Sequence, residues 1–130
     1  MVTVWPAGGA AWSGLVAGAF ADAGAVSLPS TRLPEQLDFP RTSAGLAGLA
    51  SEAGLKVREA RDVEWVWRIS ATDLWAGIEG GVATPGQAFL AQEPTVRAKT
   101  KLAFHARALA ESVGDQMAFP CRAVLVVAAR

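Results

Sequence analysis

The spacing of hydrophobic residues changes along the N-terminal part of the chain. A short apolar run comes first, and apolar residues at helical spacing follow it. Residues 2–5 are a β-branched and aromatic run that ends at Pro6, which predicts a short strand. Over residues 12–23 apolar side chains recur at helical spacing until Gly24, which predicts a helix with a glycine stop. Residues 25–41 contain three prolines and little periodicity, so we expect an extended loop there.

The middle of the chain predicts a helix that leads directly into a long strand. Thr42 or Ser43 can cap the helix, and Gly54 ends it because glycine takes the left-handed conformation at little cost. Residues 55–68 predict the strand, which is polar at first. Its second half alternates and places three apolar residues on one face: Val63, Trp65 and Trp67.

Helices and a closing strand are predicted for the second half of the chain. Ser70 and Asp73 form a capping box at the start of a third helix, which the Gly- and Pro-rich residues 80–86 end. Residues 95–113 predict the clearest helix. One apolar stripe runs along it: Ala98, Leu102, Ala106, Leu109 and Val113. Residues 121–129 contain a continuous apolar run, which is typical of a strand covered on both faces.

Composition and charge narrow the class of protein. The 130 residues are 52% hydrophobic and 18% charged, which suits one compact domain. Twelve basic side chains balance twelve acidic ones, so the sequence predicts no nucleic-acid partner and no anionic membrane surface. The N-terminal segment lacks the basic residues of a signal peptide, and Asp22 interrupts its apolar part. We therefore expect a cytoplasmic protein without a membrane span.

Four segments resemble the C-terminal half of class I S-adenosylmethionine-dependent methyltransferases, of the small-molecule type related to the ubiquinone-biosynthesis enzymes. In chain order they are VTVWP (the fifth strand and its exit), LASEAGLKV (the helix leading into the sixth strand), RISATDLWAGIEGG (a cap segment) and FPCRAVLVVAAR (the seventh strand). Their order and spacing carry the resemblance, and together they span nearly the whole chain.

The resemblance implies an α/β fold with part of a Rossmann-like methyltransferase sheet. Its three strands resemble the fifth, seventh and sixth strands of that family, the last two antiparallel. Residues 1–130 are then a single domain, the C-terminal portion of such a fold, with a helical cap or insertion over about residues 69–115.

The resembling family binds S-adenosylmethionine at a Gly-rich turn after the first strand and grips the ribose with an acidic residue after the second. Neither feature occurs in this sequence, and the nearest Gly-rich stretch, PAGGA at residues 6–10, lacks the Gly-x-Gly spacing. We therefore expect no cofactor-binding residues and no S-adenosylmethionine bound to this chain alone.

The resemblance then implies the substrate-side half of a small-molecule methyltransferase, inactive in isolation, whose partner is a small-molecule methyl acceptor. The alternatives are a non-catalytic α+β small-ligand-binding or assembly module derived from that fold, and an unrelated small-ligand domain.

Five tryptophans are the most conspicuous candidates for a binding site. The resemblance places Trp5 on the loop after the fifth strand, Trp12 on the following helix and Trp75 on the cap. These three are candidate substrate-binding residues because aromatic walls with few polar groups are typical of small-molecule pockets. Plain core packing is the alternative for each of them.

No catalytic residue and no metal ligand set stand out in the sequence. His105, the only histidine, is a candidate general base if it points into a pocket. The alternative for His105 is a residue at the edge of the apolar stripe with one nitrogen in water. Cys121, the only cysteine, has no patterned base near it, so we expect a buried structural thiol rather than a nucleophile.

The N-terminal strand also predicts an assembly. The resembling fold pairs its fifth strand with a fourth strand that this sequence does not contain. Residues 2–5 would then present an unpaired edge, and exposed edges pair readily with another chain. We therefore expect a homo-oligomer that forms through the exposed N-terminal strand.

Overall fold

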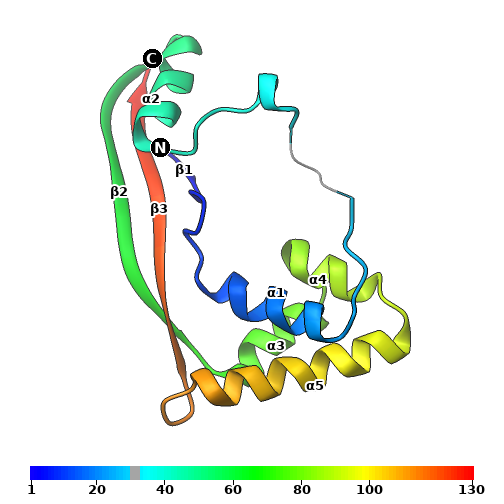
Figure 1. The fold of residues 1–130 in the computed structure, drawn as a ribbon. Helices are drawn as coiled ribbons and strands as arrows, with labels where there is room; N and C mark the ends of the chain where they lie inside the picture. Colours follow the sequence, from blue (N-terminus) through cyan, green and yellow to red (C-terminus); the bar gives the residue numbers. More distant parts are fainter. Residues whose placement is uncertain (30–32) are drawn as a thin grey trace. The chain divides into compact units, whose positions relative to one another are not determined.

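The computed structural model describes residues 1–29 and 33–130 (Figure 1). Within these residues the chain forms three strands, five α-helices and one short 3-10 helix. In chain order they are β1 (Val2–Val4), α1 (Trp12–Asp22), η1 (Glu35–Leu37), α2 (Ser43–Glu52), β2 (Lys56–Ile69), α3 (Ala71–Glu79), α4 (Ala83–Leu90), α5 (Pro94–Glu111) and β3 (Met117–Ala129). Residues 30–32 of the predicted loop lie outside the described residues.

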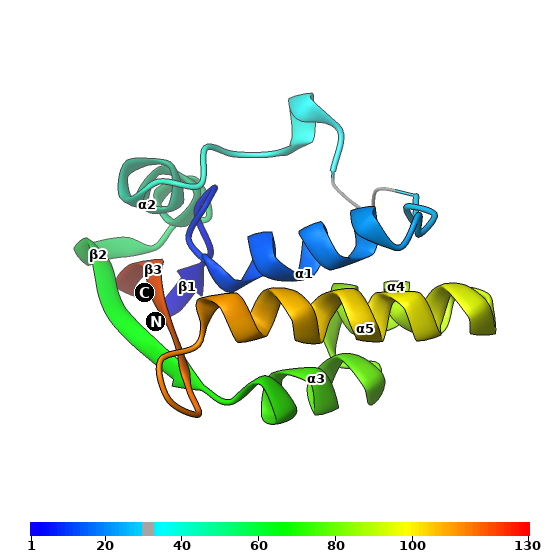
Figure 2. The same ribbon diagram turned by 60° about the horizontal axis from the view of Figure 1, so that its bottom comes forward.

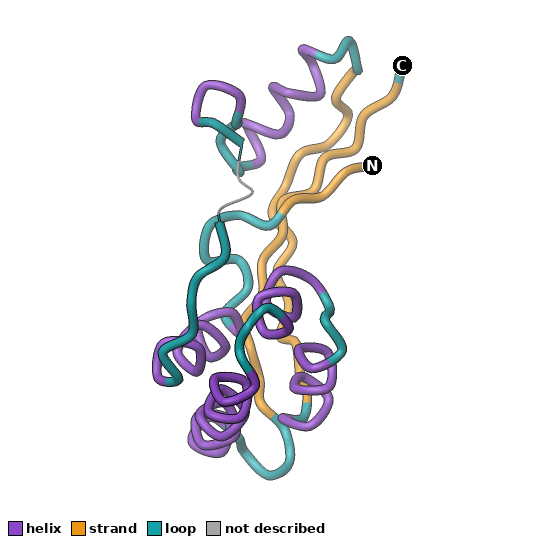
Figure 3. Tube along the Cα trace, turned by 90° about the vertical axis from the view of Figure 1, so that its right-hand side faces the viewer, coloured by secondary structure: helices purple, strands orange, loops and turns teal. Residues whose placement is uncertain are grey.

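β3 is the central strand of the sheet, although it comes last in the chain. The strand order is β1–β3–β2 in an open antiparallel sheet (Figure 3). β1 pairs with β3 so that Val2 lies opposite Val126 and Val4 opposite Val124. The predicted α/β class and the antiparallel pairing are confirmed, and the C-terminal strand lies between the other two.

The described residues fall into two compact units, each with its own packing. The first contains residues 1–10, 33–66 and 120–130, and the second contains residues 11–29 and 67–119. The cap expected over about residues 69–115 lies within residues 67–119 of the second unit.

The core of the first unit forms where α2 packs on the sheet. Its buried cluster consists of Leu46 and Ala50 from α2 with Val124 and Val126 from β3. Thr42 caps α2, because its side-chain oxygen accepts a hydrogen bond of 3.1 Å from the N–H of Gly45. The sequence allowed Thr42 or Ser43 as the cap, and the structure assigns it to Thr42.

Four helices, α1, α3, α4 and α5, make up most of the second unit (Figure 2). The predicted cap of α3 is confirmed: Ser70 Oγ accepts from the N–H of Asp73 at 3.0 Å and donates to the Asp73 carboxylate at 2.7 Å. The largest buried side chains on these helices belong to Trp75, Phe89 and Phe104. These aromatic residues form the centre of the unit.

The prediction that residues 80–86 end the third helix and remain a loop is wrong. Gly80 does end α3, but α4 begins at Ala83 and contains Pro85 and Gly86. Proline is tolerated in the first turn of a helix because the N–H groups there have no intrahelical partner. Gly86 is buried, and a Cβ atom there would lie 2.4 Å from the carbonyl carbon of Gly81. Here glycine permits a close approach of two backbone segments rather than a turn.

The apolar stripe of α5 does not face the core. The buried residues of this helix are Thr100, Phe104 and Ala108, on the opposite face. Leu102 and Leu109 of the stripe are 74% and 80% exposed, and Val113, just beyond the helix, is 88% exposed. Thr100 is buried without an unsatisfied hydroxyl, since its Oγ1 donates to the carbonyl of Val96 at 2.8 Å. α5 therefore carries apolar residues on two faces.

Candidate functional site

A pocket on the second unit is lined almost entirely by apolar surface. Its volume is about 240 Å³, and it lies between α1 and α4. The lining residues are Trp12, Ser13, Val16, Ala17 and Phe20 from α1, and Thr84, Pro85 and Ala88 from α4. We call it the Trp12 pocket. An apolar concavity with few polar groups is the usual form of a small-molecule site.

Other aromatic side chains hold Trp12 in place at this pocket. Its ring lies 6.1 Å from that of Trp67, nearly edge to face, and Trp67 lies 6.4 Å from Phe119. Tilted aromatic contacts at these distances are favourable because the positive ring edge meets the negative ring face. Trp12 is therefore packed on one side and borders the pocket on the other.

The α4 wall of the Trp12 pocket begins at a strained residue. Ala83 has a φ of 53°, and among the described residues it is the one non-glycine residue in this region. Its neighbours Thr84 and Pro85 both line the pocket. Residues other than glycine are strained there because Cβ crowds the backbone. Such strain is common beside ligand sites.

Trp75 lies in the core of the second unit and is 4% exposed. Its ring contacts Phe89 at 5.0 Å, Phe104 at 5.1 Å and His105 at 5.8 Å. The indole Nε1 is buried and has no hydrogen-bond partner among the described residues. Trp75 is not among the residues that line the Trp12 pocket. The packing alternative that the sequence left open describes Trp75 best.

His105 is an exposed residue of α5. Its ring packs against Trp75 and lies 5.4 Å from Phe104. It is not among the residues that line the Trp12 pocket. In the part of the chain that the structure describes, nothing aims His105 at a bound reactant, and its position matches the boundary-residue alternative.

Trp5 belongs to the first unit and is 48% exposed. Its ring lies 5.6 Å from Trp65, tilted by 49°. It borders an open hollow of about 650 Å³ that also involves Phe39, Asp38 and Arg41. Trp5 and Trp12 therefore border different concavities, each within its own unit.

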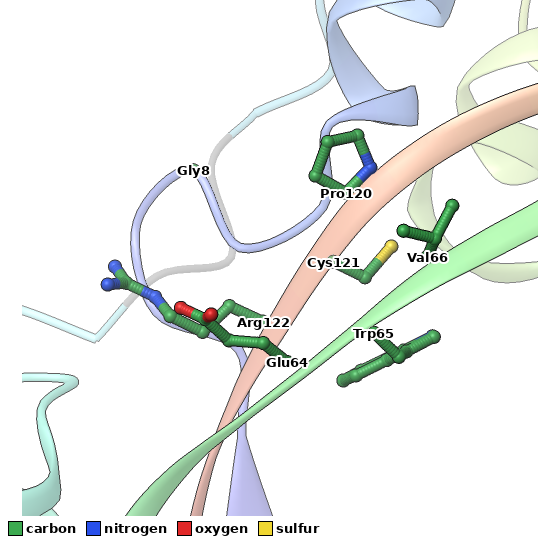
Figure 4. Close-up of a pocket in the computed structure, with 7 residues that line it drawn as sticks. All are labelled: Gly8, Glu64, Trp65, Val66, Pro120, Cys121 and Arg122. Atoms are coloured by element: carbon green, nitrogen blue, oxygen red, sulfur yellow. The ribbon is translucent and has the colours of Figure 1, made fainter.

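A second hollow of the first unit is lined in part by Cys121 and has a volume of about 490 Å³ (Figure 4). Cys121 is 4% exposed, and its thiol is free. Figure 4 shows the side chains of Glu64 and Arg122 on the same side of the two strands. The guanidinium of Arg122 lies 3.8 Å from the carboxylate of Asp62. No histidine is among the residues that line this hollow, so the buried structural role expected for Cys121 remains the best interpretation.

The glycines of PAGGA pack the chain onto β3. Gly8 has a φ of 69°, and the N–H of Gly9 donates to the carbonyl of Pro6 at 3.0 Å. A Cβ atom on Gly9 would lie 2.5 Å from the carbonyl oxygen of Arg122. The stretch is a tight turn. Gly8 is needed for its positive φ, and Gly9 is needed for the close approach to the backbone of Arg122.

α1 and α5 are joined at the surface of the second unit by a two-point ion pair. Arg107 Nε and Nη2 donate to the two carboxylate oxygens of Asp22 at 2.7 and 3.0 Å. These hydrogen bonds hold the pKa of Asp22 below its ordinary value and raise that of Arg107. The guanidinium lies over Gly18, where a Cβ atom would come within 2.6 Å of Nη1.

The sequence did not predict the α4 wall of the Trp12 pocket. Residues 80–86 combine glycine and proline, which usually indicates a turn. The signal for a helix was the pair of apolar residues Phe89 and Leu90 following a proline that can occupy a first turn.

Three further findings bear on the site. None of the described helices is long and apolar enough to cross a membrane. Across residues 1–29 and 33–130, no group of three or more His, Cys, Asp or Glu side chains could hold a metal ion. Comparison of the chain with protein-family models, with curated proteins and with solved structures found no match.

Proposed function

We propose that this chain is the acceptor-binding part of a class I S-adenosylmethionine-dependent methyltransferase fold, and that catalysis needs a cofactor-binding part in addition. The observation that carries the proposal is the place of β3 between β1 and β2. Strands that follow one another in sequence are usually neighbours in the sheet. The family that the sequence resembles departs from this habit in the same way, because its seventh strand lies between the fifth and the sixth.

The Trp12 pocket is the acceptor site in this proposal. It is built on the helix that follows β1 and on α4 of the segment between β2 and β3. A volume of about 240 Å³ suits a small molecule, or the ring of a larger one. Since Ser13 and Thr84 supply the only side-chain hydroxyls of the lining, we infer a neutral, mainly apolar acceptor with one nucleophilic oxygen or nitrogen.

The contribution of this chain to methyl transfer is positioning. A bound S-adenosylmethionine would be held by the cofactor-binding part and would supply the methyl group. Holding the acceptor in line removes much of the entropic barrier of such a transfer. Trp12 and Phe20 form flat apolar walls that orient the acceptor ring. The acceptor atom releases its proton to solvent.

A second candidate is a small-ligand-binding module without catalysis. The Trp12 pocket favours this candidate because all of its lining residues belong to the second unit. Such a pocket needs no cofactor part to bind its ligand.

A chimera distinguishes the two candidates. The first four strands of a class I methyltransferase, with their Gly-rich turn, are joined ahead of Val2, and methyl transfer to a panel of small phenols and anilines is measured by mass spectrometry. We expect methylated product from the chimera and none from the donor part alone. We also expect Trp12→Leu in the chimera to lower kcat/KM for the acceptor while S-adenosylmethionine binding is unchanged.

The failed outcomes are distinct as well. A chimera that folds and binds S-adenosylmethionine without methylating any compound bound by the 130-residue chain would favour the ligand-binding module. Tight stoichiometric binding of S-adenosylmethionine to the 130-residue chain, measured by calorimetry, would contradict the assignment of this chain to the acceptor side.

A further inference from the structure

A small concavity of the second unit lies where α5 begins, next to the last residues of α3 and α4. Its volume is about 290 Å³, and it shares no lining residue with the Trp12 pocket. The α5 side of the lining is one stripe of the helix, because its residues follow the spacing i, i+3, i+4 and i+7. The lining includes Pro94, Arg97, Ala98 and Lys101 from α5, and Phe89 and Leu90 from α4. We call it the Arg97 hollow.

The Arg97 hollow contains one positive charge that no carboxylate balances. Glu79, at the end of α3, completes the lining, and its carboxylate accepts a hydrogen bond of 3.1 Å from Lys101 Nζ. Arg97 forms no ion pair with any described residue. This includes Glu93, which precedes Arg97 by four residues, the usual spacing of a helical ion pair. The charge that remains in the hollow is therefore that of the Arg97 guanidinium.

The same guanidinium is partly shielded from water. Arg97 is half-buried, and its Nε is buried without a hydrogen-bond partner in the described part of the chain. The indole Nε1 of Trp75 is likewise buried and unpaired. Trp75 packs against two lining residues of the hollow, with Phe89 at 5.0 Å and Lys101 Nζ at 5.8 Å from its ring. Buried donors without an acceptor are costly, above all charged ones, so this region favours an acceptor supplied from outside the chain.

We propose that the Arg97 hollow binds a small carboxylate with an apolar body, and that the carboxylate pairs with the guanidinium of Arg97. The parallel N–H groups of a guanidinium match the two oxygens of a carboxylate. Phe89, Leu90 and Pro94 offer apolar surface to the rest of the ligand. Pro94 is also the first residue of α5, so the positive end of the helix dipole lies at the hollow, and no side chain caps that end.

The lining favours a ligand with a single negative charge. A phosphate monoester carries nearly two negative charges at neutral pH, and the carboxylate of Glu79 in the lining opposes the second. A volume of about 290 Å³ is at the small end of ligand pockets and suits a molecule with one ring. Benzoate is therefore the probe, and benzamide is its uncharged counterpart of similar shape. This site does not depend on the proposed function, because the Trp12 pocket takes no part in it.

The first test is titration of the 130-residue protein with benzoate and with benzamide, followed by NMR. We expect benzoate to shift the signals of Phe89, Leu90 and Arg97, with a dissociation constant in roughly the millimolar range. Benzamide is expected to bind about tenfold more weakly, because it lacks the charge that pairs with Arg97. Added salt is expected to weaken the binding of benzoate more than that of benzamide.

Variants of Arg97 test the role of the guanidinium. Arg97→Gln is expected to weaken benzoate binding by about tenfold, to the level of benzamide. Arg97→Lys keeps the charge without the planar fork and is expected to restore part of the affinity. Lys99→Gln, an exposed position of α5 outside the lining, is the matched control and is expected to leave binding unchanged. Trp12→Leu is also expected to leave it unchanged, because Trp12 lines the other pocket.

Thermal unfolding gives a second, independent readout. Arg97→Met keeps an unbranched apolar stem and removes the unpaired N–H groups, so the melting temperature of the ligand-free protein is expected to rise. Benzoate is expected to raise the melting temperature of the wild type and not that of Arg97→Met, since a ligand that binds the folded state stabilises it. If Arg97 were paired within the chain, Arg97→Met would lower the melting temperature instead.

Several results would overturn the proposal. Equal binding of benzoate and benzamide contradicts it, and so does the absence of benzoate binding at any accessible concentration. Benzoate binding that Arg97→Gln leaves intact would exclude the guanidinium as its partner. If Trp12→Leu weakened benzoate binding as strongly as Arg97→Gln does, the carboxylate would not be confined to the Arg97 hollow, and two separate sites would be refuted. Circular dichroism shows whether each variant keeps its helices.

Discussion

The backbone of Gly9 touches that of Arg122 on β3 without a side chain between them. The N–H of Arg122 donates to the carbonyl of Gly9 at 2.7 Å, and a Cβ atom on Gly9 would lie 2.5 Å from the Arg122 carbonyl oxygen. This contact extends the pairing of the N-terminal segment with β3 beyond β1 itself, together with the bridge between Ala10 and Cys121. Glycine at position 9 is a requirement of that pairing.

We predict that Gly9→Ala lowers the free energy of unfolding by about 1–3 kcal/mol, because backbone atoms must shift to admit the methyl group. Urea unfolding followed by circular dichroism measures the change. Gly14→Ala in α1 is the matched control, since nothing lies within 4 Å of the position of its Cβ atom. That change is expected to stabilise the protein by about 0.5–1 kcal/mol. Equal effects of the two substitutions would contradict the close approach.

The ion pair between Asp22 and Arg107 predicts a pH dependence of stability. The folded-state pKa of Asp22 lies below its ordinary value of 3.8, so the unfolded chain binds its proton at higher pH than the folded one. The contribution of the pair is therefore fully present above that ordinary value, and it is lost as pH falls through the folded-state pKa. Both side chains are exposed, so we expect a modest effect that salt weakens further.

Chemical unfolding between pH 2 and 7 measures this dependence in wild type and Asp22→Asn. The difference between the two proteins is expected to be constant near neutral pH and to shrink at acid pH. Glu52→Gln, at the end of α2, serves as the control for the loss of one carboxylate. A difference that grows as pH falls would have the wrong sign and would refute the assignment.

Elements whose signals are local could be predicted from the sequence. The caps of α2 and α3 depend on Thr42 and Ser70, whose side chains reach N–H groups only three residues on. Gly54 ends its helix with a φ of 77°, a conformation that glycine adopts freely. These interactions do not depend on what the helix packs against, so the sequence was sufficient.

The buried face of α5 could not be predicted because two apolar faces compete on one helix. Counting apolar positions favours the Leu102–Leu109 stripe, but the core of the unit is aromatic and takes Phe104. The roles of the candidate site residues could not be predicted for a similar reason. Trp12 and Trp75 are the same residue type on predicted helices, and only the neighbours Phe89 and Phe104 decide that Trp75 is core. Such choices depend on contacts between distant segments, which override local propensity.

The strained residue Ala83 predicts a stabilising substitution. Its φ of 53° places an alanine where Cβ crowds the backbone, and glycine removes that crowding. We expect Ala83→Gly to stabilise the protein by about 1 kcal/mol in thermal or urea unfolding. Ala76→Gly, within α3, is the control and is expected to destabilise by about 1 kcal/mol, as glycine does in a helix interior. A loss of stability for both variants would show that position 83 is not strained.

Trp12 and Trp75 are expected to separate binding from stability. Trp75 is 4% exposed and packs against three aromatic rings, so Trp75→Ala should lower the free energy of unfolding by about 3–5 kcal/mol. Trp75→Phe should lower it far less, because phenylalanine keeps a ring in the core and removes the unpaired indole N–H. Trp12 borders an open pocket, and Trp12→Leu should lower stability by only about 1–2 kcal/mol.

Binding should show the opposite order of effects. Titration of the 130-residue protein with the small phenols and anilines used above, followed by NMR, identifies the compounds that occupy the Trp12 pocket. Trp12→Leu is expected to weaken their binding by about tenfold, since it removes a flat wall in contact with the ligand. Trp75→Phe should leave binding unchanged in the folded protein. If Trp75→Phe weakened binding while Trp12→Leu did not, the ligand site would have to lie beside Trp75, and the assignment of the pocket between α1 and α4 would be wrong.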